Sequence, residues 1–113
     1  MRTKQSTTLD DFLLQESRRI GSLIARLRIA RNLKQATTAI RAGMSRNTAY
    51  RIETGDPGVA LGQILKYLDV LVPGMTLKDL LLENNPALVA LAVSEKKRRV
   101  RDLPLDQLKE LDF

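Results

Sequence analysis

The segment from Gln35 to Thr54 constrains the fold most, because its residue pattern predicts two short helices joined by a tight turn. Ala39 lies in the middle of the first helix, and Gly43 follows four residues later. A small residue lets the second helix pack close to the first, and glycine adopts a positive φ at little steric cost. Ala49 and Ile52 are three residues apart and turn one side of the second helix toward the core. The other faces of this helix are expected to meet solvent.

Apolar residues recur at helical spacing on both sides of this segment. They are Ile20, Leu23, Ile24 and Leu27 before it, and Leu61, Ile64, Leu65, Leu68 and Leu71 after it. Gly21 can kink or divide the first of these helices, and Asn32 is a suitable end for it because asparagine tolerates a left-handed backbone. Thr76 and Asp79 have the spacing of a capping box at the start of a short fifth helix. The predicted fold class is all-α, with a compact five-helix domain and a short C-terminal extension.

A separate apolar segment, Ala87 to Val93, follows the five helices. So short a segment does not let periodicity separate helix from strand, and the preceding Asn85-Pro86 pair, a good start for a helix, favours the helix. The segment has no obvious partner within so small a domain, and exposed apolar surface of this kind usually marks an interface. We therefore expect a two-fold homodimer built from this segment and the fifth helix.

Charge narrows the class of partner. The chain has 19 Lys and Arg against 13 Asp and Glu, a net charge of +6, and a basic chain favours a polyanionic partner. Residues 1–34 hold eight basic and three acidic residues, so most of the excess lies there. A second basic run, Lys96 to Arg101, can grip DNA phosphates, bind an acidic protein surface or simply solubilise this end of the chain. The sequence leaves these three roles open.

Residue types that many enzymes and metal sites require are missing. The chain has no Cys and no His, which excludes disulfides, thiolate and imidazole metal ligands, and catalysis by either side chain. The carboxylates are scattered, and there is no Gly-rich phosphate loop. We expect no enzyme activity, no cofactor and no metal. Because it lacks a membrane-spanning apolar run and a signal-peptide core, the protein is expected to be cytoplasmic.

The second short helix carries side chains suited to reading DNA. Arg46 and Asn47 lie near its start, on faces other than that of Ala49 and Ile52. Arg can make two hydrogen bonds to guanine and Asn two to adenine. Gln35 begins the first short helix, where its amide and free backbone N–H groups can hold a phosphate. Binding to double-stranded DNA is therefore the expected function.

A charged pair is expected to join the first long helix to the second short one. Arg28 falls on the buried stripe of the long helix, one residue after Leu27, and an unpaired buried charge is costly. Glu53 ends the short helix next to Ile52 and is the natural partner. We expect an Arg28–Glu53 ion pair that fixes the geometry of the two helices more than it adds stability.

Together these features resemble the Cro/repressor-type helix-turn-helix family, often called Xre, over roughly Ile20 to Leu82. The residues that carry the resemblance are Leu27-Arg28, Arg31, Gln35, Ala39, Ala42-Gly43-Met44-Ser45 and Arg51-Ile52-Glu53-Thr54-Gly55. The continuation from Gly55 to Gly62 and the Arg98 to Arg101 run are similar to the HipB-like branch, the DNA-binding antitoxins encoded beside HipA-type kinase toxins. Thr38 replaces the usual Leu and Lys34 the usual Ser or Thr cap, which implies a slightly weaker second helix.

The resemblance implies a role for each polar residue of the segment. The expected base contacts are Ser45, Arg46, Asn47 and Arg51. The expected phosphate contacts are Gln35, Thr48 and Thr54, and Tyr50 is either a further phosphate ligand or a packing residue.

The resemblance also implies a domain organisation and a mechanism. Residues 1–17 are an N-terminal extension, 18–83 the helix-turn-helix DNA-binding domain, and 84–113 a C-terminal extension for dimer or partner contact. The implied protein is a dimeric repressor that blocks polymerase from an inverted-repeat operator, autoregulates its operon and acts as antitoxin to a HipA-like kinase. On its operator it would be associated with the bacterial nucleoid. Two alternatives stay open: a stand-alone phage or host repressor of this fold, and a kinase-inhibiting interaction module for which DNA binding is secondary.

Overall fold

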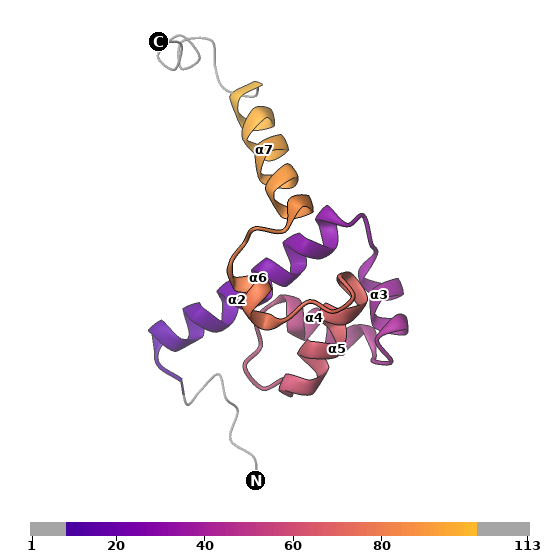
Figure 1. Ribbon diagram of the computed structural model, residues 1–113. Helices are drawn as coiled ribbons and strands as arrows, with labels where there is room; N and C mark the ends of the chain where they lie inside the picture. The colour runs from indigo at the N-terminus through magenta and orange to yellow at the C-terminus, as the bar shows by residue number, and fades with distance from the viewer. Residues whose placement is uncertain (1–8, 102–113) are drawn as a thin grey trace.

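The computed structural model describes residues 9–101, and these residues form six helices and no strand. The helices are α2 (Asp11–Ala30), α3 (Gln35–Arg41), α4 (Arg46–Glu53), α5 (Leu61–Leu71), α6 (Leu77–Leu81) and α7 (Pro86–Arg101). Helices α2 to α6 are gathered into one body, from which α7 projects (Figure 1). The prediction of an all-α fold with five helices and a C-terminal extension is confirmed. Residues 1–8 and 102–113 of the two predicted extensions lie outside the described part of the chain.

Helix α2 is one continuous helix of 20 residues. Asp10 caps its start, because Oδ1 accepts a hydrogen bond from the Leu13 backbone nitrogen at 2.9 Å. The helix ends just before Asn32, whose φ of 57° is the left-handed conformation that the sequence predicts there. Gly21 does not divide the helix, and the helix also continues across residues 17 and 18, where the sequence suggests a domain boundary.

The missing side chain at Gly21 lets α2 touch the end of α4 backbone to backbone. A Cβ atom at this position would lie 2.4 Å from the Gly55 nitrogen and 2.7 Å from the Ile52 oxygen. A Cβ at Gly55 would lie 2.4 Å from the Cα of Arg18, and the φ of 77° at Gly55 also favours glycine. The Ser17 hydroxyl donates a hydrogen bond to the Gly55 oxygen at the same crossing. The two glycines therefore set the distance between the two helices.

The core is almost entirely aliphatic and is shared by α2 and the four shorter helices of the body. Its most buried aliphatic residues are Leu23, Ile24 and Leu27 of α2, Ala39, Ala49 and Ile52 of α3 and α4, and Leu68, Leu71 and Leu80 of α5 and α6. Thr38 is buried with them, and its hydroxyl donates to the Lys34 oxygen at 2.9 Å, so its polar atom is satisfied within α3. Lys34 gives α3 no side-chain cap, whereas Thr76 and Asp79 form the predicted capping box of α6.

Helix α7 resolves the choice between helix and strand for Ala87 to Val93 in favour of the helix, and it continues through the basic run to Arg101. Asn85 Oδ1 accepts a hydrogen bond from the Ala87 nitrogen at 2.9 Å, as its place before Pro86 predicts. The helix packs against α2 through the buried Leu88 and through an ion pair between Glu95 and Arg26. No helix among residues 9–101 has the length and apolar content needed to cross a membrane.

Replacing Gly21 with Ala is expected to lower the free energy of unfolding by about 2 kcal/mol, because the added methyl group meets backbone atoms of α4 and Gly55. Gly62→Ala in α5 is the matched control. No atom lies within 4 Å of the Cβ position there, and alanine in a helix is more favourable than glycine by up to about 1 kcal/mol. Urea unfolding followed by circular dichroism measures both variants. A Gly21→Ala protein as stable as the wild type would contradict the close helix contact.

Candidate nucleic-acid interface

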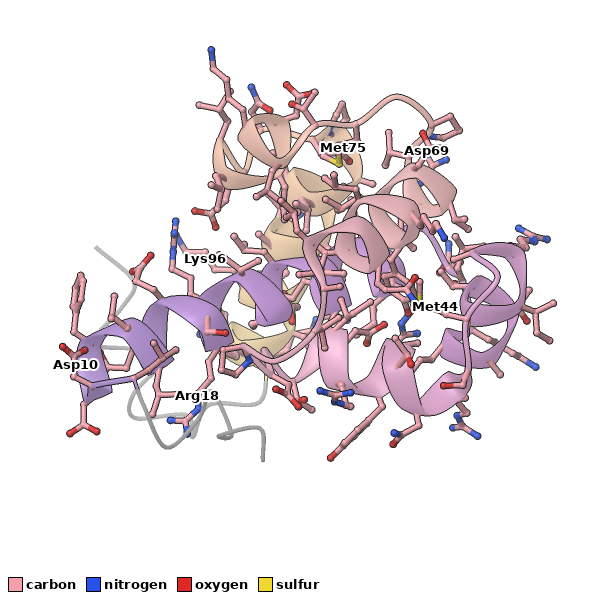
Figure 2. The ribbon with its side chains drawn as sticks, turned by 90° about the horizontal axis from the view of Figure 1, so that it is seen from below. Asp10, Arg18, Met44, Asp69, Met75 and Lys96 are labelled. Atoms are coloured by element: carbon pink, nitrogen blue, oxygen red, sulfur yellow. The ribbon has the colours of Figure 1, made fainter. Side chains whose placement is uncertain are left out.

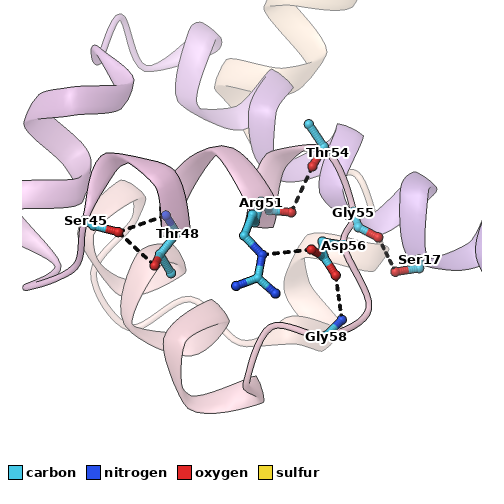
Figure 3. A network of polar contacts seen from close by, with 8 residues as sticks. All are labelled: Ser17, Ser45, Thr48, Arg51, Thr54, Gly55, Asp56 and Gly58. Carbon is cyan, nitrogen blue, oxygen red and sulfur yellow. Dashed lines mark hydrogen bonds and ion pairs between the residues drawn. The ribbon is translucent and has the colours of Figure 1, made fainter. Parts of the chain in front are cut away.

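Four residues join α3 to α4 in a turn that is fixed by hydrogen bonds. Gly43 has the predicted positive φ, 71°, and the Met44 nitrogen donates to the Ala39 oxygen at 3.0 Å. Ser45 then caps α4, because its Oγ accepts from the Thr48 nitrogen at 3.1 Å. The same Oγ lies 3.0 Å from Thr48 Oγ1 (Figure 3). The start of α4 is therefore held in one orientation relative to α3.

Helix α4 divides into a buried and an exposed side. Ala49 is fully buried and Ile52 is nearly so, as their spacing predicts. Arg46, Asn47 and Tyr50 are exposed, with 58% of Tyr50 open to solvent. The first turn of the helix thus presents a guanidinium and a carboxamide at successive positions, and the exposed phenol of Tyr50 lies one turn after Arg46.

A polar network inside the body locks α4 to α2 and α5. Arg28 makes two hydrogen bonds to Glu53, from Nε to Oε2 at 2.7 Å and from Nη2 to Oε1 at 3.0 Å. Its Nη1 donates to the Leu33 oxygen at 2.8 Å, and the Tyr67 hydroxyl of α5 donates to Glu53 Oε2. The Glu53 side chain is only 6% exposed, so this ion pair is shielded from water. The Arg28–Glu53 pair expected from the sequence is therefore present, with a tyrosine as a third member.

The network also shifts the pKa values of Tyr67 and Arg28 upward. Burial, and then the hydrogen bond to Glu53, raise the pKa of Tyr67 well above its usual value, so its hydroxyl stays protonated and keeps donating. The hydrogen bond to Glu53 raises the pKa of the Arg28 guanidinium. A permanently charged donor and a permanently neutral one thus share a single carboxylate.

Arg51, one of the expected base contacts, already has a partner within the protein. Its Nε donates to Asp56 Oδ2 at 2.8 Å, while Asp56 Oδ1 accepts from the Gly58 nitrogen at 2.8 Å (Figure 3). The bond from Arg51, followed by that from the Gly58 N–H, lowers the pKa of Asp56, so this carboxylate stays ionised at neutral pH. The Nε of Arg51 is therefore occupied, and no hydrogen bond among residues 9–101 involves its two terminal amino groups.

The expected phosphate contacts lie at the start of α3, along α4 and just after its end. Gln35 is the partly exposed first residue of α3, and Tyr50 is exposed on α4. The Thr48 side chain lies against the cap of α4, and the Thr54 hydroxyl donates to the Arg51 oxygen at 3.1 Å. Both threonine hydroxyls therefore have a partner within the protein before any ligand is bound.

Sequence analysis missed two members of these networks. Tyr67 lies on the apolar stripe of α5, between Ile64 and Leu71 at helical spacing, so the periodicity that identified the helix could also have marked it as buried. Asp56 follows Arg51 by five residues and opens a Pro-Gly turn, in which an Asp side chain readily accepts a backbone hydrogen bond. An Asp before a Pro-Gly turn is common in protein sequences, however, and does not by itself predict a contact with Arg51.

Comparison with known families agrees with this geometry, since residues 19–72 match the family model of the helix-turn-helix domain. The match spans the later part of α2 and all of α3, α4 and α5, so α4 is the second helix of the motif. In helix-turn-helix proteins this helix lies in the major groove of DNA, which indicates a DNA-binding regulator. Searches of curated proteins and of solved structures gave no match.

Removing the cation of the buried network should destabilise the helix-turn-helix domain strongly. Arg28→Met is expected to lower the free energy of unfolding by about 3 kcal/mol, because it leaves the Glu53 carboxylate buried without its charged partner. Arg19→Met is the control. Its ion pair with Glu83 joins side chains that are about half exposed, so the expected loss is below about 1 kcal/mol. Equal losses in the two variants, measured by urea unfolding, would show that the network does not lock α4 in place.

Proposed function

We propose that the protein is a sequence-specific DNA-binding transcriptional repressor of the Xre type, in which α4 reads base edges in the major groove. The observation that carries this proposal is that α4 has one buried side and one exposed side. Ala49 and Ile52 hold the helix in the core, while Arg46 and Asn47 stand exposed on its first turn. Residues at the start of the second helix are the ones that contact bases in this motif.

The proposed base contacts are Ser45, Arg46, Asn47 and Arg51. Arg46 and Asn47 have the donor and acceptor patterns that match guanine and adenine. Arg51 would read with its terminal amino groups, since its Nε is held by Asp56. The proposed phosphate contacts are Gln35, Thr48, Tyr50 and Thr54, which would orient the domain on the duplex without reading its sequence.

A homodimer formed by α6 and α7 is part of the proposal. Val89 and Val93 on α7 are each 49% exposed, and Leu81 and Leu82, at and just after the end of α6, are exposed as well. A two-fold partner would cover these apolar side chains and place two copies of α4 in successive major grooves about 34 Å apart, on an inverted-repeat operator. Sedimentation equilibrium measures the molecular mass of the wild type and of Val93→Asp, and so separates dimer from monomer. A wild-type monomer at micromolar concentration would contradict the dimer.

The finer proposal is that this repressor is the HipB-like antitoxin of a HipA-like kinase and autoregulates its operon in the bacterial cytoplasm, at the nucleoid when bound to its operator. It rests on the Gly55 to Gly62 segment and the Arg98 to Arg101 run. A kinase reading frame beside the gene, whose toxicity this protein suppresses on co-expression, would support it. Absence of such a neighbour favours a stand-alone phage or host repressor. Undiminished repression after loss of the α4 side chains favours an interaction module that inhibits a kinase.

Arg46→Ala and Asn47→Ala are each expected to weaken binding to the operator about 5- to 150-fold, the range that corresponds to one lost bidentate base contact. Footprinting on the DNA upstream of the gene first defines the protected duplex, and fluorescence anisotropy then gives the affinities. Lys66→Ala is the charge-matched control for Arg46→Ala, since it removes one positive charge from an exposed residue of α5. Binding by Arg46→Ala and Asn47→Ala as tight as that of Lys66→Ala would contradict base reading by α4.

Asp56→Asn is expected to lower the ratio of specific to non-specific affinity, because an amide nitrogen cannot accept the hydrogen bond that orients Arg51. The remaining amide oxygen can still accept from the Gly58 nitrogen, so the turn is preserved. Non-specific affinity should stay the same or rise, since one negative charge is removed. Anisotropy titrations with the protected duplex and with a scrambled duplex give the ratio. An unchanged ratio would mean that Asp56 does not position Arg51 for recognition.

A further inference from the structure

The last turn of α4 meets a cationic residue from outside the helix-turn-helix pair. At the crossing of α2 and α4, a Cβ at Gly55 would lie 2.4 Å from the Arg18 Cα and 2.5 Å from the Ser17 oxygen. The Ser17 hydroxyl is hydrogen-bonded to the Gly55 oxygen at this point. The backbone of Arg18 is therefore fixed directly beside the residue that follows the cap of α4.

The Arg18 side chain is exposed and points to the side of α2 on which α4 lies (Figure 2). Among residues 9–101, no ion pair involves Arg18. The adjacent Arg19 behaves differently, because it pairs with Glu83 at 3.3 Å and lies 4.0 Å from Glu16. The two neighbouring arginines thus have different surroundings, because Arg19 is ion-paired and Arg18 is not, among the residues that the structure describes.

The C-terminal end of α4 carries negative charge, so a nearby cation would favour the approach of DNA. The last carbonyl groups of a helix carry partial negative charge, and the ionised Asp56 lies just beyond them. Both repel a phosphate that follows the groove wall past the end of the helix. The guanidinium of Arg18, a residue whose Cα adjoins Gly55, offsets this repulsion and supplies several N–H donors in a geometry suited to phosphate oxygens.

We propose that Arg18 binds a backbone phosphate of duplex DNA beside the C-terminal end of α4, so that α2 is a third DNA-contacting helix. This inference rests on the proposed function, because it requires α4 to lie in the major groove. Base reading occurs at the start of α4, and Arg18 lies beside its end, so the contact is to phosphate and independent of sequence.

The test compares Arg18→Gln with Arg19→Gln, which remove the same charge from adjacent positions. For each, the affinity for the footprinted duplex is measured by anisotropy over a range of KCl concentrations. Loss of one phosphate contact makes the slope of log K against log salt shallower by about 0.9. We expect this change for Arg18→Gln, an equal loss of affinity for a scrambled duplex, and a wild-type slope for Arg19→Gln. Arg18→Lys should keep the slope.

Three results would overturn the proposal. If Arg18→Gln keeps the wild-type slope, Arg18 does not bind a phosphate. If it keeps that slope but has a lower free energy of unfolding, the role of Arg18 at the end of α4 is purely structural. Equal changes in Arg18→Gln and Arg19→Gln point to net charge rather than to a contact. The Arg46→Ala variant separates this failure from that of the proposed function: if it still discriminates against the scrambled duplex as the wild type does, α4 itself is not the reader.

Discussion

The backbone contact between α2 and the end of α4 is the constraint on which the rest of the arrangement depends. Gly21 and Gly55 face each other at a distance that admits no Cβ atom on either side. This contact brings the exposed turns of α2 beside the same helix that carries Arg46 and Asn47. The orientation of the proposed reading helix is therefore decided at its C-terminal end, away from the residues that would touch bases.

The Arg28, Glu53 and Tyr67 network adds directional restraint to this close contact. Glu53 is the last residue of α4, and it accepts hydrogen bonds from α2 and from α5 at once. A buried ion pair of this kind adds little net stability over apolar packing, but its geometry admits few alternatives. Glycine contact and polar network together hold one end of α4, and the Ser45 cap and the Gly43 turn hold the other.

Helical spacing and turn chemistry were enough to predict most of the fold. The positive φ at Gly43 and Asn32, the capping box at Thr76 and the helical start at Asn85 each follow from local backbone preferences. The Arg28–Glu53 pair was predictable because a charge on an apolar stripe requires a partner. Local sequence patterns could not predict contacts between segments that are distant in the chain. Gly21 was interpreted as a point where the helix can kink or divide, because its partner, Gly55, is 34 positions away in the chain. The contact between Arg51 and Asp56 was not predicted.

The attachment of α7 has a consequence for how the protein can change over evolutionary time. Leu88 and Glu95, its buried residue and its ion-pairing residue, are seven positions apart and so lie on one stripe of the helix, two turns from each other. The opposite stripe carries no part of the core. Substitutions on that stripe can accumulate while the packing of the body stays intact. Under the proposed function, the contacts of α7 with a partner and those of α4 with DNA can therefore diverge separately.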